Sequence, residues 1–172
     1  MSINEQKQNR TESTALAAGW YWVGDPCYAF RGQEHEVWME WLRDSWEDTD
    51  PNGTRILDGR VRGALIAASG TAYGDGSYSD QEGRLYGVDA GLIGAVHANH
   101  WFLDQKFIEA LAIAQSERER TGTHTEVEVN DMHLVYFPEP FSVSYDDGVI
   151  RVGELSIPTG WEDEDEEGED LP

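Results

Sequence analysis

The sequence predicts an α+β domain with a mostly antiparallel sheet, or a partly open barrel, and two amphipathic helices. Three observations lead to this class. Short β-prone runs end in Gly, Pro or Asp turns, two longer segments repeat apolar residues at helical spacing, and an Asp-Asp-Gly turn separates two β-prone runs. A chain of 172 residues can form one domain with one core. We therefore expect a polar N-terminal tail (1–17), a single domain (18–160) and an acidic C-terminal tail (161–172).

The N-terminal half is expected to contain one helix among several strands. Residues 20–23 are aromatic and β-prone, and a Gly-Asp-Pro turn ends this first strand. Residues 34–47 place Trp38, Trp41 and Leu42 at helical spacing, with acidic side chains pointing outward. Further strands are predicted over residues 61–69, 84–89 and 92–96.

The C-terminal half is expected to contain the second helix and a β-hairpin. The predicted helix spans residues 101–120 and ends at Gly122. Its apolar stripe comprises Leu103, Phe107, Leu111 and Ala114, broadened by Ile108 and Ala112. Residues 125–137 alternate as a strand with a bend at Asn130-Asp131, and Asp146-Asp147-Gly148 predicts the turn of a hairpin over residues 141–152.

The charge balance excludes some functions. The chain has 34 acidic and 12 basic residues, a net charge of −22, and Lys7 and Lys106 are its only lysines. A protein that binds nucleic acid through a basic surface, or an anionic membrane, needs more Lys and Arg. Three explanations of the acidity remain open: adaptation to high salt, mimicry of DNA, and an acidic face for a basic partner.

Three strand-end segments form the candidate motif loops. They span residues 24–28, 73–78 and 88–91, and each places an aspartate beside glycine or proline. These aspartates can cap turns, which is the commoner role, or they can gather as ligands for a hard cation. The spacing matches no known metal loop, so we predict no metal and no cofactor, with a site of Asp25, Asp75 and Asp89 as the alternative. The candidate residues of these loops are Asp25, Cys27, Tyr28, Tyr73, Asp75, Tyr78 and Asp89.

The motif loops also suggest a relationship. Gly24-Asp25-Pro26, followed by the Tyr-Gly-Asp-Gly-Ser-Tyr motif of residues 73–78 and an aspartate that closes the next strand, resembles a family of uncharacterised bacterial and phage proteins. The resemblance covers roughly residues 19–96. It implies no activity and therefore identifies no catalytic residue.

Tryptophans provide the candidate interface residues, and cysteine content bears on the location of the protein. Trp38, Trp41 and Trp46 cannot share one helix face, so we expect one of them near the surface as an interface residue.

Cys27 is the only cysteine, which excludes an intramolecular disulfide and favours a reducing compartment. The first 14 residues lack a secretory core, and no apolar run is long enough to span a membrane. We predict a cytoplasmic protein, with a virion-associated location as the alternative.

Together these features favour a non-enzymatic, soluble, acidic binding protein from a halophilic archaeon, or from a virus or plasmid of one. The expected partner is another protein, with basic or DNA-binding proteins as one class. The first alternative is a DNA mimic that inhibits a defence or DNA-processing enzyme. The second is a metal-dependent hydrolase that uses Asp25, Asp75 and Asp89. Enzyme signatures such as a phosphate-binding glycine loop or a nucleophile elbow are absent from the sequence.

Overall fold

A six-stranded antiparallel sheet forms the middle layer of the protein. The computed structural model describes residues 12–30, 35–47, 56–61, 63–98 and 105–160. The strand order of this sheet is β3-β4-β7-β2-β9-β8. Its strands are β2 (Gly19–Gly24), β3 (Ile56–Val61), β4 (Ala64–Gly70), β7 (Leu92–His97), β8 (Val127–Val129) and β9 (Met132–Phe137). All the pairings are antiparallel, so the predicted class is confirmed, and the described strands form open sheets rather than a closed barrel.

A four-stranded antiparallel sheet packs on one face of the middle layer. Its order is β1-β10-β11-β12, and its strands are β1 (Glu12–Leu16), β10 (Phe141–Asp146), β11 (Val149–Val152) and β12 (Leu155–Pro158). Strand β1 differs from the sequence prediction, which placed these residues in a polar tail. Leu16 is buried, and the whole strand pairs with β10. This pairing joins segments far apart in the chain, so the polar local sequence does not indicate a strand. A separate hairpin joins β5 (Gly76–Ser79) and β6 (Leu85–Val88).

Strand β2 illustrates how one sheet serves two cores. Trp20 and Trp22 face the helical layer, whereas Tyr21 and Val23 face the four-stranded sheet. Successive side chains of a strand point to opposite faces, so a strand buried on both sides must be apolar at every position. This explains why residues 20–23 are continuously apolar instead of alternating.

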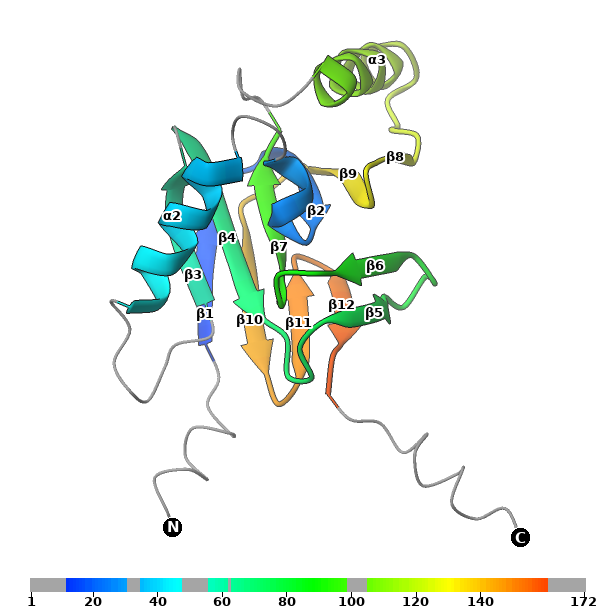
Figure 1. The fold of residues 1–172 in the computed structure, drawn as a ribbon. Helices are drawn as coiled ribbons and strands as arrows, with labels where there is room; N and C mark the ends of the chain where they lie inside the picture. The colour runs from blue at the N-terminus through cyan, green and yellow to red at the C-terminus, as the bar shows by residue number, and fades with distance from the viewer. Residues whose placement is uncertain (1–11, 31–34, 48–55, 62, 99–104, 161–172) are drawn as a thin grey trace, which may run out of the picture.

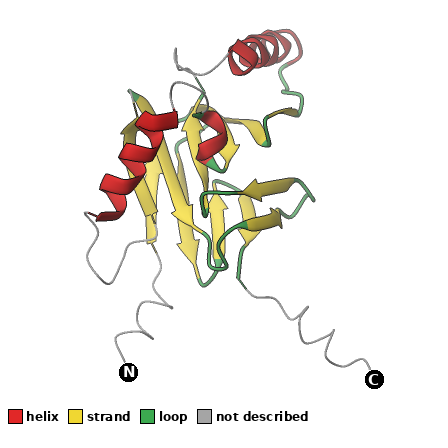
Figure 2. Cartoon of the chain, in the orientation of Figure 1, coloured by secondary structure: helices red, strands yellow, loops and turns green. Residues whose placement is uncertain are grey.

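The helices cover the other face of the middle layer. A short 3₁₀ turn, η1 (Pro26–Ala29), follows β2, and α2 (His35–Glu47) and α3 (Gln105–Thr121) are the two predicted helices. Figure 1 shows α2 beside β3 and β4, and α3 at the opposite end near β8. Figure 2 shows the helices at the outside of a centre made of strands.

The buried stripe of α3 is narrower than predicted. Phe107, Leu111 and Ala114 are buried, but Ile108 and Ala112 are exposed. The face of the helix that contacts the sheet is therefore close to one residue wide per turn. Leu103 and the rest of the predicted start of this helix lie outside the described residues.

The predicted turns have the backbone geometry that their residues suggest. Asn130 (φ 50°) and Asp131 (φ 65°) lie between β8 and β9, and Asp147 (φ 49°) and Gly148 (φ 86°) lie between β10 and β11. Positive φ at both central residues is typical of the turns that match strand twist in hairpins. One strand prediction was wrong in its bounds: within residues 61–69, Val61 is the last residue of β3, and residues 64–69 belong to β4, which ends at Gly70.

No helix within the described ranges is long and apolar enough to cross a membrane.

Candidate functional site

Asp25 joins two of the three motif loops. Its side chain is buried, and its Oδ1 accepts a hydrogen bond from the backbone N–H of Cys27 at 3.0 Å. Its Oδ2 accepts from the N–H groups of Asp89 and Ala90 at 2.8 and 2.7 Å. Burial raises the pKa of Asp25, and the three backbone donors oppose this rise. Both carboxylate oxygens are therefore occupied by donors of the chain itself.

Tyr28 and Asp89 add a second connection between the same loops. The Tyr28 hydroxyl donates to Oδ2 of Asp89 at 2.5 Å. Burial of Tyr28 and the nearby Asp89 carboxylate together raise the pKa of the tyrosine hydroxyl. The tyrosine therefore stays protonated at neutral pH and acts as a hydrogen-bond donor.

The loop of residues 73–78 is held by hydroxyl groups. Thr71 Oγ1 donates to the carbonyl of Gly74 at 2.6 Å and accepts from the N–H of the same residue at 2.8 Å. The Tyr78 hydroxyl donates to the same carbonyl at 2.7 Å. Thr159 connects this loop to the four-stranded sheet, because its Oγ1 accepts from Ala72 N at 3.0 Å and donates to Gly148 O at 2.7 Å. Tyr73 itself is half exposed.

The three loops lie next to one another, but their aspartates play different parts. The Asp75 side chain reaches the third loop, since its Oδ1 would lie 3.8 Å from a Cβ placed on Gly91. Asp75 and Asp89 are exposed, whereas Asp25 is turned inward. Within the part of the chain that the structure describes, no three His, Cys, Asp or Glu side chains are arranged to hold a metal ion. The geometry of Asp25 is that of a turn cap that holds two loops together. Cys27 is half-buried in η1 beside it.

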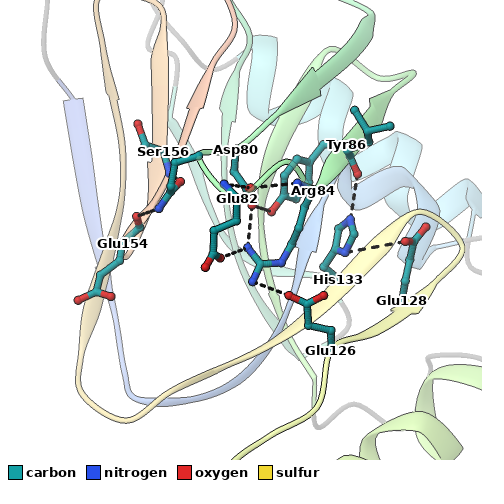
Figure 3. Close-up of polar contacts among 11 residues, drawn as sticks. Asp80, Glu82, Arg84, Tyr86, Glu126, Glu128, His133, Glu154 and Ser156 are labelled. Carbon is teal, nitrogen blue, oxygen red and sulfur yellow. Dashed lines mark hydrogen bonds and ion pairs between the residues drawn. The ribbon is translucent and has the colours of Figure 1, made fainter.

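A second polar cluster centres on Asp80, which the sequence analysis did not single out. Figure 3 shows it between the β5–β6 hairpin and strand β9. Oδ1 of the buried Asp80 accepts from the N–H groups of Glu82 and Arg84, at 2.8 and 3.1 Å. Its Oδ2 accepts from the Tyr86 hydroxyl at 2.7 Å and from Arg84 Nη1 at 3.0 Å. Burial acts to raise the pKa of Asp80, but these four hydrogen bonds outweigh it and lower the pKa.

Arg84 extends this cluster toward strands β8 and β9. Its guanidinium also pairs with Glu82 at 2.5 Å and with Glu126 at 3.1 Å. His133 Nε2 lies 2.9 Å from the carbonyl oxygen of Leu85, which can only accept, so this nitrogen carries a hydrogen. The His133 ring packs edge-on against Tyr86, with centroids 4.9 Å apart. The Asp80 cluster therefore docks the hairpin on the sheet and leaves no free proton acceptor at Asp80.

Gln81 completes the docking of this hairpin. Its Nε2 donates to the carbonyl of Glu154 at 2.7 Å, and its Oε1 accepts from the N–H of Ser156 at 2.8 Å. The side-chain amide thus pairs with the outer edge of β12 as a neighbouring strand would, which protects an exposed sheet edge. The sequence signal for this region is the Asp80-Gln81-Glu82-Gly83 run, in which Asp at the first and Gly at the fourth position are typical of a type I turn.

The candidate interface tryptophans occupy different environments. Trp38 is fully buried and stacks between Phe30 and Trp41, with ring centroids 5.3 and 5.5 Å apart. A buried core position makes Trp38 unavailable to a partner. Trp41 is partly buried over β3, close to Gly59. Trp46 lies in α2, but its side chain is outside the described part of the structure.

The outward face of α2 bears a row of carboxylates. Glu36, Glu40 and Asp44 are all exposed and follow one another at intervals of four residues. Side chains four residues apart lie on one face of a helix, about 6 Å apart along its axis. Arg43 approaches Asp44 at 3.6 Å, with both side chains largely exposed. We refer to Glu36, Glu40 and Asp44 as the α2 row.

Comparisons of this chain with protein-family models, with curated proteins and with solved structures found no match. The resemblance inferred from the motif loops therefore stays a prediction.

Proposed function

We propose that this chain is a non-enzymatic acidic protein that acts by binding another protein, and that it comes from a halophilic archaeon or a virus or plasmid of one. The observation that carries the proposal is the position of the carboxylates. The side chains of Asp25 and Asp80 are buried, and their carboxylate oxygens accept hydrogen bonds from donors of the chain. Nearly all the other acidic side chains in the described ranges are exposed.

This distribution favours binding over catalysis. A general acid or base needs a carboxylate in reach of a substrate, with its pKa moved toward neutrality. Asp25 has a raised pKa, but three backbone N–H groups at hydrogen-bond distance surround its oxygens. Exposed carboxylates in a protein of net charge −22 instead create a negative field that attracts a basic partner.

Two variants that lose the same number of charges test whether a basic partner binds at one particular part of the surface. Neutralising the α2 row (Glu36→Gln, Glu40→Gln, Asp44→Asn) and neutralising three exposed turn residues (Asp131→Asn, Glu139→Gln, Asp147→Asn) each remove three negative charges. We expect a labelled arginine-rich peptide to bind the first variant several-fold more weakly than the second. Equal weakening of both would show that only net charge matters and would contradict a localised interface.

The halophilic origin has its own test. At high salt the repulsion among these carboxylates is screened within a few ångströms, whereas at about 0.1 M it extends to about 10 Å. We expect lowering KCl to about 0.1 M to unfold the domain, as followed by circular dichroism. A domain that stays folded there would argue against a halophilic source.

Mimicry of DNA is the second candidate, and the regular spacing of the α2 row favours it. Duplex DNA presents phosphates at short, regular intervals, so a straight row of carboxylates can occupy the same cationic groove. The test is inhibition of a panel of purified restriction and repair enzymes. Inhibition that is lost on neutralising the α2 row, but kept in the turn variant, would support mimicry. No inhibition across the panel would argue against it.

A further inference from the structure

A solvent-open recess lies between the C-terminal turns of α3 and the neighbouring strands β2 and β9. Its volume is about 510 Å³, which is within the range of sites for small organic ligands. Its lining residues are Trp20, Gln115, Arg118, Glu119, Gly122 and Tyr136. None of these lining residues belongs to the motif loops, the Asp80 cluster or the α2 row.

Aromatic side chains form the wall that belongs to the sheet. Trp20 and Tyr136 are cross-strand partners in the β2–β9 pairing, and their ring centroids are 5.1 Å apart. His124 packs edge-on against Trp20 at 5.8 Å. The two rings of the Trp20–Tyr136 pair are tilted by 59° to each other and Trp20 is 9% exposed, so a ligand ring can reach only the exposed part of this rigid aromatic pair.

Arg118 gives the recess its charged group. The guanidinium carbon lies 3.8 Å from the centroid of the Tyr136 ring, and the side chain is half-buried. No carboxylate of the described residues forms an ion pair with Arg118, whereas Arg120, two positions along the same helix, pairs with Glu117. Arg60 and Arg151 also have no carboxylate partner among the described residues, so what distinguishes Arg118 is that it stacks on Tyr136 and lines the recess.

We propose that this recess binds an aromatic carboxylate, with its ring against the exposed parts of Trp20 and Tyr136 and its carboxylate accepting hydrogen bonds from Arg118. A guanidinium that stacks on a tyrosine keeps its edge N–H groups available, and these match the two oxygens of a carboxylate. The net charge of −22 disfavours polyanions such as nucleotides, so the ligand carries one negative charge. Exposed Glu119 repels the carboxylate weakly, because solvent screens it, and it can accept from a donor elsewhere on the ligand.

The test is a titration of the ¹⁵N-labelled protein with 3-phenylpropionate, followed by NMR. The indole signal of Trp20, identified by its loss in Trp20→Phe, and the amide signal of Gly122 should shift saturably. The neutral analogue 3-phenylpropionamide should bind at least tenfold more weakly, which is about 1.4 kcal/mol. Arg118→Gln should cause a similar loss for the carboxylate.

Arg120→Gln is the matched control, because it removes the same charge from the same helix outside the recess lining. Its affinity for 3-phenylpropionate should stay within twofold of the wild type. Arg118→Lys, which keeps the charge but not the planar fork, should bind with intermediate affinity. Unchanged amide signals from the four-stranded sheet will show that the variants are folded. The proposal would be overturned by the absence of a saturable shift, by equal binding of amide and carboxylate, or by equal effects of Arg118→Gln and Arg120→Gln.

Discussion

Replacing Asp80 by asparagine tests the central polar cluster with the smallest change in shape. In Asp80→Asn, Oδ1 can still accept from the backbone N–H groups of Glu82 and Arg84, whereas an amino group replaces Oδ2. That group cannot accept from the Tyr86 hydroxyl or from Arg84 Nη1. Hydrogen bonds to a charged group contribute about 1.5–3 kcal/mol each, and a new bond from the amide to the Tyr86 oxygen returns about 1 kcal/mol. We therefore expect the free energy of unfolding to fall by about 3 kcal/mol.

The pH dependence of the same substitution follows from the lowered pKa of Asp80. The ionised carboxylate stabilises the native state fully above the ordinary pKa of aspartate, about 3.9. This contribution disappears as the pH falls through the lower pKa of the folded state. The stability difference between wild type and Asp80→Asn should thus be constant near neutral pH and should shrink below about pH 4.

Urea unfolding at a series of pH values measures both effects, with Glu82→Gln as the control. Glu82 pairs with the same arginine, but its side chain is 58% exposed, so its loss should reduce stability by less than about 1 kcal/mol. A loss below about 1 kcal/mol for Asp80→Asn, or a loss equal to that of Glu82→Gln, would refute the assignment of Asp80 as the centre of the cluster.

Three further substitutions probe other contacts, each measured by chemical unfolding at pH 7. Asp25→Ala leaves three backbone N–H groups without their acceptor and should reduce stability by about 3 kcal/mol or more. A loss under about 1 kcal/mol would mean that the two motif loops do not depend on the Asp25 carboxylate. Gly94→Ala would place Cβ 2.2 Å from the carbonyl oxygen of Ala67 on β4, so we expect the free energy of unfolding to fall by more than about 3 kcal/mol. Gly87→Ala is the control, because its Cβ would meet only the Tyr28 hydroxyl, at 3.6 Å, and it should be nearly neutral. Similar stabilities for these two glycine variants would contradict the close approach of β4 and β7. Thr159→Val removes the hydroxyl between Gly148 and Ala72 and should reduce stability by about 1–3 kcal/mol. Thr159→Ser keeps the hydroxyl and should retain most of the stability. Equal losses in the two variants would exclude the hydroxyl as the cause.

The local parts of the fold could be predicted because their signals are local. Helix α2 was found from the spacing of its apolar residues, and the turns at Asn130-Asp131 and Asp147-Gly148 were found from residues that tolerate positive φ. Strand β1 was missed because its polar sequence becomes a strand only through pairing with β10, more than 120 residues away. The exposure of Ile108 was missed because periodicity shows that a helix has an apolar side, but not how much of that side the sheet covers.

The candidate sites likewise combine features that the local sequence indicates with features that only the fold reveals. The motif loops stood out from their Asp-Gly and Asp-Pro pairs, but only the fold shows that both oxygens of Asp25 are filled and that Asp75 and Asp89 are exposed. The sequence by itself determined the class, the acidity and the turn residues, because composition, periodicity and turn preference belong to each segment alone. The tertiary structure decided the burial of Trp38, the Asp80 cluster and the recess beside Arg118. Each of these depends on contacts between segments distant in the chain, and such contacts follow from strand order and packing.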